Sequence, residues 1–534
     1  MKIKNTIFIK DWLVLKPYEK QTETDNYYLK ICNKVKNQIT QYSELFEEFD
    51  LPDGINHLSC FLTSYFEDII SESNIWNSFV KIHKRMYGKQ LPFYDVSEYF
   101  EEEINIQDVT FLIWYFFNTI QQERFVSPYN PVFFDMAFNI MDVFDDEYEF
   151  APENKHLQSF YTINKNETDF YIARALIDNI LFNSYLFYFD TFKELMLEEA
   201  DIIEEANEEY LISILQENHN NLLLSLHTRL LAFKGQDWAA EIVGKNHPLH
   251  NDYLNISKRI VGYFFYKGQD DENIFLEHIA SGKKFNLTKK SFDHSDSLKE
   301  IDSFIYMGIV LWQNEWWFSG VFFTTEFNAD IVLDEKNSVE HRRMVSFLDD
   351  KSKIYESLED EYKAFKEFSG GSQIVFLKVD KIDNYIRNYI EYFNKSLKLS
   401  EKAKAKAIKR IKKEGLLDID TNNTSYLTDL EDAESGLVFF NPKSGIEIAV
   451  DINSAFPSPE NPFYNEQENE EAILKLFMNE SYSTELVKYN IDNFKNEIPF
   501  FKKPEGQFFL ENADFLLRFF KRGYYHTEPQ ITLI

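Results

Sequence analysis

The fold of this chain is decided by two neighbouring runs, Phe304-Ile-Tyr-Met-Gly-Ile-Val-Leu-Trp312 and Trp316-Trp-Phe-Ser-Gly-Val-Phe-Phe323. Both are rich in β-branched and aromatic residues, and the short polar turn Gln-Asn-Glu separates them, which is typical of a β-hairpin. Similar runs precede them at Val261–Tyr266, Ile274–Ile279 and Lys284–Leu287. About five short strands with tight connections predict a small barrel, either SH3-like or OB-like.

Helical patterns lie on both sides of this β-rich stretch. Between residues 20 and 245, apolar residues recur at helical spacing, as in residues 55–70. Gly (16) and Pro (14) are scarce, which favours long regular elements. We therefore predict an α+β fold: a helix-dominated chain with an inserted small β-barrel and a C-terminal α+β portion.

Changes in the pattern divide the chain into four segments. We expect a helical domain at 1–248, the barrel at 249–334, a helical segment ending in a basic helix at 335–415, and an α+β C-terminal domain at 416–534. The first boundary rests on Pro248, which follows a helix stop signal.

The charge of the chain restricts its partners. Hydrophobic residues make up 44% of the 534 residues, enough for well-formed cores, and the net charge is −33. An acidic chain is repelled by nucleic acid and anionic lipid unless a local patch reverses the sign. The charge fits either solubility or an acidic surface presented to a basic partner.

The sequence places the protein in the cytoplasm by elimination. Cys32 and Cys60 are the only cysteines, and we expect them to be buried free thiols. The N-terminus has no signal-peptide pattern, and the most apolar run, residues 111–120, is too short to cross a bilayer. The sequence also lacks the glycine-rich motifs that bind phosphates, and we expect no cofactor.

One cluster has the residue types of a metal site. His247, His250 and Asp252 lie close together and could bind Zn²⁺ or Fe²⁺, which would permit a metal-dependent hydrolase. The cluster follows a helix, contains a proline and lacks the helical H-E-x-x-H context. A surface loop is therefore the alternative interpretation, and enzyme activity has no support from any other motif.

The strongest local charge reversal is a predicted basic helix at residues 400–414. Its cations could bind RNA phosphates, a ribosome, or an acidic face of a partner or of this chain, or they could simply face solvent. They are Lys402, Lys404, Lys406, Lys409, Arg410, Lys412 and Lys413.

The barrel offers a second set of recognition residues. On an OB-like surface, Trp312 and Trp316 could stack on nucleotide bases, and the nearby Lys283 and Lys284 could neutralise phosphates. Because alternate strand residues face opposite sides, about half of the aromatic residues must instead be core. Core packing with a protein-docking surface is the interpretation we favour.

Several phrases resemble an uncharacterised family of cytosolic bacterial proteins of unknown function, with similarity along the whole chain. They are Lys10-Asp-Trp-Leu13, Leu15-Lys-Pro-Tyr18, Trp316-Trp-Phe-Ser-Gly320, Phe439-Phe-Asn-Pro-Lys-Ser-Gly445 and Asp451-Ile-Asn-Ser-Ala-Phe456. The central segment also resembles a small barrel found in proteins with a C-terminal Cys-rich metal-binding motif. This chain lacks those cysteines, so the resemblance implies neither a metal nor catalytic residues.

Together these features predict a non-enzymatic intracellular interaction or adaptor protein that docks through its barrel and basic helix, with a protein as partner. RNA or ribosome association through residues 400–414 is the first alternative. A metal-dependent hydrolase at His247 and His250 is the second. The sequence carries no indication of the oligomeric state.

Overall fold

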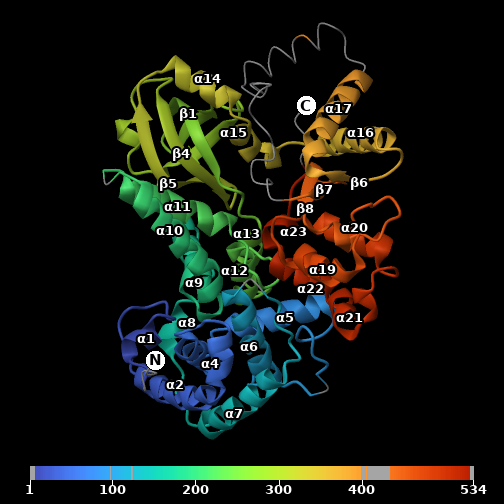
Figure 1. The fold of residues 1–534 in the computed structure, drawn as a ribbon. Helices are drawn as coiled ribbons and strands as arrows, with labels where there is room; N and C mark the ends of the chain where they lie inside the picture. The colour runs from blue at the N-terminus through green and yellow to red at the C-terminus, as the bar shows by residue number, and fades with distance from the viewer. Residues whose placement is uncertain are drawn as a thin grey trace.

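In the computed structural model, the described residues are 6–397 and 433–529, together with the isolated Ala405, and apart from 97, 122, 123 and 208. The first half of the chain is helical (Figure 1). Its helices are α1 (Ile9–Leu13), α2 (Asp25–Ile39), α3 (Ser43–Glu48), α4 (Gly54–Ile70), α5 (Ile75–Tyr87), α6 (Ile106–Ile120), α7 (Pro131–Tyr148), α8 (Lys155–Ser159), α9 (Phe170–Asn183), α10 (Lys193–Glu205), α11 (Leu211–Ser225), α12 (Gly235–Val243) and α13 (His250–Leu254).

The β-rich stretch forms a closed five-stranded barrel. Its strands are β1 (Ile260–Gln269), β2 (Asn273–His278), β3 (Lys284–Thr288), β4 (Phe304–Trp312) and β5 (Glu315–Thr325). They follow the order β1-β2-β3-β5-β4, and β5 meets β3 in parallel at Leu287 and Trp316. Of the two barrel types expected, this Greek-key order with a parallel β3–β5 contact is that of the OB-fold.

Alternation along the strands explains why these residues build a barrel. In β2, buried and half-buried side chains alternate without exception, and Ile274 and Leu276 point inward. Phe264 of β1 pairs directly with Ile305 of β4, and both side chains belong to the same interior. The barrel therefore has a core of its own, separate from the core of the helical domain.

The remaining elements complete an α+β fold, as predicted. They are α14 (Ala329–Asn337), α15 (Val339–Met344), α16 (Ser352–Phe368), β6 (Ile374–Lys378), α17 (Val379–Ser396), β7 (Ser435–Asn441), β8 (Gly445–Val450), α19 (Asn469–Met478), α20 (Thr484–Phe494), α21 (Pro504–Glu511), α22 (Ala513–Phe520) and α23 (Arg522–Tyr525). Strands β6, β7 and β8 form one antiparallel sheet. This sheet joins the segments 335–415 and 416–534, which the sequence pattern had separated.

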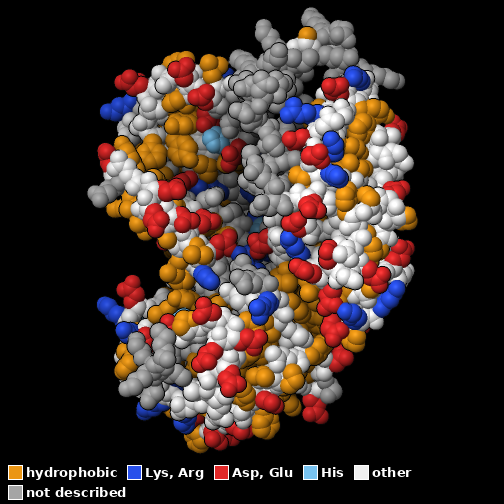
Figure 2. Space-filling view, in the orientation of Figure 1, with side chains coloured by type: hydrophobic (Ala, Val, Ile, Leu, Met, Phe, Trp, Pro, Cys, Tyr) orange, Lys and Arg blue, Asp and Glu red, His pale blue; other side chains and the backbone are white. Residues whose placement is uncertain are grey.

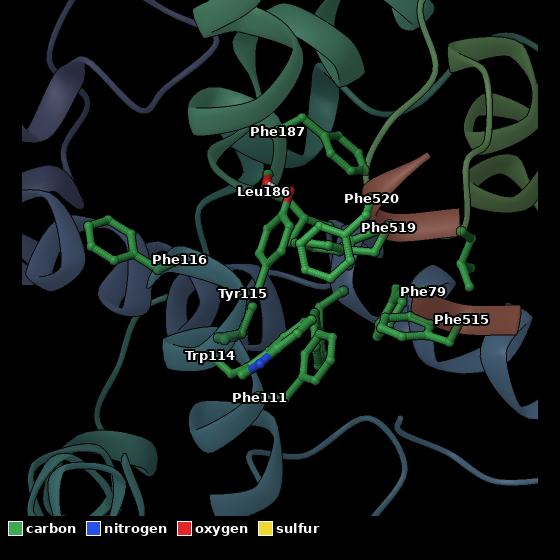
Figure 3. Close-up of a cluster of buried hydrophobic side chains, with 14 of the residues drawn as sticks. Phe79, Phe111, Trp114, Tyr115, Phe116, Leu186, Phe187, Phe515, Phe519 and Phe520 are labelled. Carbon is green, nitrogen blue, oxygen red and sulfur yellow. Dashed lines mark hydrogen bonds between the residues drawn. The ribbon is translucent and has the colours of Figure 1, made fainter. Parts of the chain in front are cut away.

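The end of the chain returns to the N-terminal core. Phe515 and Phe519 of α22 insert among Phe111 and Trp114 of α6, and the ring centroids of Trp114 and Phe519 are 5.0 Å apart (Figure 3). Offset and edge-to-face pairs of this kind add to the free energy of simple area burial. Helix α22 therefore anchors the C-terminal portion on the N-terminal helices.

Candidate functional site

The residues of the predicted metal site do not converge. Asp252 accepts a hydrogen bond from the Gln313 amide at 2.9 Å, which ties α13 to the β4–β5 turn. His247 Nδ1 accepts from the Leu249 amide, whereas His250 Nδ1 lies 3.3 Å from Asn251 Oδ1. Among the described residues, no group of His, Cys, Asp and Glu has the arrangement of a metal site.

The four barrel candidates are dispersed over the barrel. Trp312, proposed as a surface residue, is instead only 1% exposed and packs against Phe170 and Tyr253 of the helical domain. Trp316 is half-buried with its ring on Phe285. The Lys283 amine forms a salt bridge with Asp349 at 2.5 Å, and Lys284 is exposed.

The seven cations of the predicted basic helix lie outside the described residues. Their expected role in binding phosphate or protein therefore stays a prediction.

The structure draws attention to a different place, a groove of about 590 Å³ between the barrel and the helices α11 and α15. Its lining residues come from six elements: the helices α10 and α11, the strands β1, β4 and β5, and the helix α15. In Figure 1, α10 and α11 lie beside the barrel. The apolar lining consists of Ile202, Ile214, Val261, Val321, Phe323 and Met344. The polar lining includes Arg259, Glu217, Asn218, Glu340 and His341.

Arg259 lies at the base of this groove, just before β1. Its Nε and Nη2 donate to the Ser319 carbonyl at 3.2 and 2.7 Å, and Nη2 also donates to Glu217 Oε2 at 2.7 Å. The side chain is 3% exposed, so the ion pair with Glu217 is largely shielded from solvent. Glu217 of α11 also accepts from the Val321 amide at 3.2 Å, which ties the helix to β5.

Two glycines make room for the Arg259 guanidinium. A Cβ at Gly308 or Gly320 would overlap Arg259 Nη2, and Gly320 has φ +103°, a conformation that other residues rarely adopt. Gly320 belongs to a β-bulge, because Gly308 pairs with Ser319 while Met307 pairs with Phe322. Bulges of this kind redirect side chains beside functional sites.

Two hydrogen-bond donors in the groove have no acceptor within the described residues. Arg259 Nη1 and Asn218 Nδ2 are both buried and unpartnered. A buried donor without an acceptor costs about 1–3 kcal/mol, so native proteins rarely retain one without a reason. Since both atoms belong to groove-lining residues, they mark positions where a ligand could supply acceptors.

An aromatic surface stands next to these donors. The rings of Tyr263 and Tyr306 meet edge to face with their centroids 5.2 Å apart, and the ring centroids of Tyr306 and Phe323 are 6.1 Å apart. Phe323 is 45% exposed. Burial, with the nearby Glu217 carboxylate as a second cause, raises the pKa of the Tyr306 hydroxyl, so Tyr306 is neutral at physiological pH. The groove thus combines hydrogen-bond donors with apolar surface.

Helix α15 closes the groove on the side of His341. The His341 ring Nδ1 lies 2.8 Å from Glu335 Oε2, and Glu335 is buried. This contact with Glu335 raises the pKa of His341 above its usual value. The ion pair joins α15 to α14, and Val345, directly after α15, enters the barrel core.

Sequence reasoning missed the groove, although one signal was present. Gly308 and Gly320 both fall inside predicted strands, where an isolated glycine indicates a bulge or a close approach. The partner of that approach, Arg259, is 49 and 61 residues away along the chain and could not be identified from the pattern.

Comparison with known proteins gives one family match. The family described as "Protein of unknown function (DUF3843)" matches residues 6–272, half of the chain, which covers the helical domain and β1. No curated protein and no solved structure matches the chain. In the part of the chain that the structure describes, no helix has the length and apolar character needed to cross a membrane.

Proposed function

Since the chain belongs to the DUF3843 family of proteins of unknown function, we propose a role from the groove itself: a non-enzymatic interaction protein that binds an extended segment of a partner protein. The observation that carries this proposal is the pair of buried donors, Arg259 Nη1 and Asn218 Nδ2, beside apolar walls. Peptide carbonyls are suitable acceptors for both donors, and alternate side chains of the same extended segment can fill apolar pockets.

The charge of the groove supports a neutral acceptor over an anion. The Arg259 charge is balanced by Glu217 at 2.7 Å, and Glu340 adds a further carboxylate to the lining. A phosphate or carboxylate ligand would meet this negative charge, whereas a peptide carbonyl carries no net charge.

A nucleic-acid role for the barrel has less support. OB-folds bind oligonucleotides through the β2–β3 face and the β1–β2 loop. In this barrel that loop contains Asp270, Asp271 and Glu272. Three carboxylates at this position would repel phosphates, so we favour a protein partner.

We also propose that the protein acts in the cytoplasm. Cys32 and Cys60 are buried free thiols, as predicted, with their Sγ atoms 3.7 Å apart. Cysteines that are not joined in a disulfide are typical of proteins in a reducing compartment.

The test is binding of a labelled neutral octapeptide, Gln-Leu-Gln-Phe repeated twice, followed by fluorescence anisotropy on the full chain. Asn218→Leu removes one unpartnered donor at nearly constant volume. We expect affinity to fall about fivefold to tenfold, the value of one hydrogen bond, while the unfolding midpoint is unchanged or rises. Unchanged affinity in Asn218→Leu, or no binding by the parent protein, would refute the proposal.

A further inference from the structure

The surface beside the groove combines exposed apolar and acidic side chains. On α10 and α11, large apolar residues face solvent: Met196 (51% exposed), Leu197 (58%), Ile203 (56%) and Ile212 (72%). Single exposed apolar residues are ordinary, but a contiguous group marks an interaction site. Figure 2 shows acidic side chains gathered over α10 and α11, next to the hydrophobic side chains of the barrel.

The carboxylates of this surface lie on α10 and on the residues that follow it. Within the described residues, none of them forms a salt bridge; they are Glu198, Glu199, Asp201, Glu204, Glu205 and Glu209. Like charges this close on one helix repel each other and lower its stability. A cationic ligand would relieve that repulsion and would also associate faster.

The acidic surface is continuous with the groove. Ile202 of α10 lines the groove, and Asp201 and Glu205, one helical turn apart, lie together on the neighbouring face of the same helix. The second observation is Arg259 Nη1, which lines the same groove and is buried without a hydrogen-bond partner among the described residues. A segment whose carbonyl reaches Arg259 therefore extends its outward side chains past the carboxylates of α10.

From this geometry we infer that the partner segment is basic, with Lys or Arg alternating with apolar residues. In an extended chain, alternate side chains point to opposite sides, so the apolar set fills the groove while the cations face α10. This inference rests on the proposed peptide-binding function and adds the charge of the partner to it. The occupant is a segment of another protein.

The experiment compares three labelled octapeptides on the full chain: Lys-Leu-Lys-Phe, Gln-Leu-Gln-Phe and Glu-Leu-Glu-Phe, each repeated twice. We expect the basic peptide to bind about tenfold more tightly than the neutral one at low salt, with a smaller ratio at high salt, and the acidic peptide to bind weakest. Equal binding of the basic and neutral peptides would overturn the inference and leave the proposed function standing. If none of the three peptides bound, both the inference and the proposed function would be refuted.

A matched pair of variants identifies the responsible carboxylates. The triple variant Asp201→Asn, Glu204→Gln, Glu205→Gln removes exposed charges, so the fold is retained, and it should abolish the preference for the basic peptide while neutral binding persists. The control is Asp142→Asn, Asp145→Asn, Asp146→Asn on α7, at the end of the molecule away from the barrel in Figure 1. It removes the same number of charges and should leave the preference intact. If both triple variants lost the preference for the basic peptide equally, the preference would depend on net charge alone and the inference would be refuted.

A third variant tests the chain's own basic segment as the occupant. Replacement of Lys402, Lys404, Lys406, Lys409, Arg410, Lys412 and Lys413 by Gln should leave the affinity for the basic peptide unchanged. A large gain in affinity would show that these residues compete for the acidic surface, which would overturn the assignment to a partner.

Discussion

The alanine substitution of Gly320 tests the central element of the groove. Both Gly320 and Gly268 lie in barrel strands with positive φ, +103° and +117°, so alanine at either position carries a backbone penalty of about 1–2 kcal/mol. The surroundings differ, because a Cβ at Gly268 meets only Ile301 Cδ1 at 3.7 Å. At Gly320 the same atom would overlap Arg259 Nη2 and Glu217 Oε2.

This overlap forces Arg259 and Glu217 apart. Breaking a buried ion pair costs about 3–5 kcal/mol when one charge stays buried. The Glu217 side chain is 20% exposed and can move toward water, so we expect a smaller additional cost of about 2–3 kcal/mol for Gly320→Ala over Gly268→Ala. The loss of stability should be confined to the barrel and α11, since Arg259 and Glu217 join these two parts.

Urea unfolding monitored by tryptophan fluorescence gives the stability difference, because Trp312, Trp316 and Trp317 lie in the barrel. The parts of a chain this long need not unfold together, so hydrogen exchange is used to locate the loss of stability. We expect faster exchange in β4, β5 and α11 for Gly320→Ala only. Equal destabilisation in the two variants would refute the claim that Gly320 exists to admit Arg259.

Three further predictions concern the surroundings of the groove and the core. Glu335 raises the pKa of His341 in the folded state. The pair therefore stabilises the fold fully below the unfolded pKa of about 6.5, and this stabilisation is lost as the pH rises through the folded pKa of His341. His341→Gln should lower the unfolding midpoint more at pH 6 than at pH 8.5. Burial raises the pKa of Asp108 to about 7, so the folded state holds the Asp108 proton more tightly than the unfolded state. The free energy of unfolding therefore falls as the pH rises from about 4 to about 7, by at most roughly 4 kcal/mol. Asp108→Asn should flatten that decline in unfolding curves measured across this range. Phe519→Ala should cost about 3–5 kcal/mol and expose the C-terminal portion to limited proteolysis, whereas Phe138→Ala, 61% exposed, should change little.

Local pattern was sufficient for the elements and the fold class. Helix α4 was evident from apolar residues at helical spacing between Ile55 and Ile69, all of which are buried. The barrel strands were evident from β-branched and aromatic runs separated by turns. Both signals depend on neighbours within a few residues, and that range is accessible to sequence reasoning.

Pairing and topology lay beyond that range. The sequence left SH3-like and OB-like barrels open, because the choice depends on β5 lying between β3 and β4, a non-local contact. Likewise β6 pairs with β7 across more than fifty residues of chain, and α22 enters a core begun by α5 and α6. No local propensity encodes which strand edge or helix face an element will meet.

By itself, the sequence determined the acidic charge, the α+β class, the position of the β-rich stretch and the unusual glycines at 308 and 320. Only the tertiary structure decided that these glycines surround Arg259 and that Glu217 neutralises it. It also decided that Arg259 Nη1 has no acceptor in the part of the chain that the structure describes. The physical reason is that hydrogen-bond satisfaction is a property of three-dimensional neighbours. A donor can be read from the sequence, but the absence of its acceptor becomes visible only when the chain is folded.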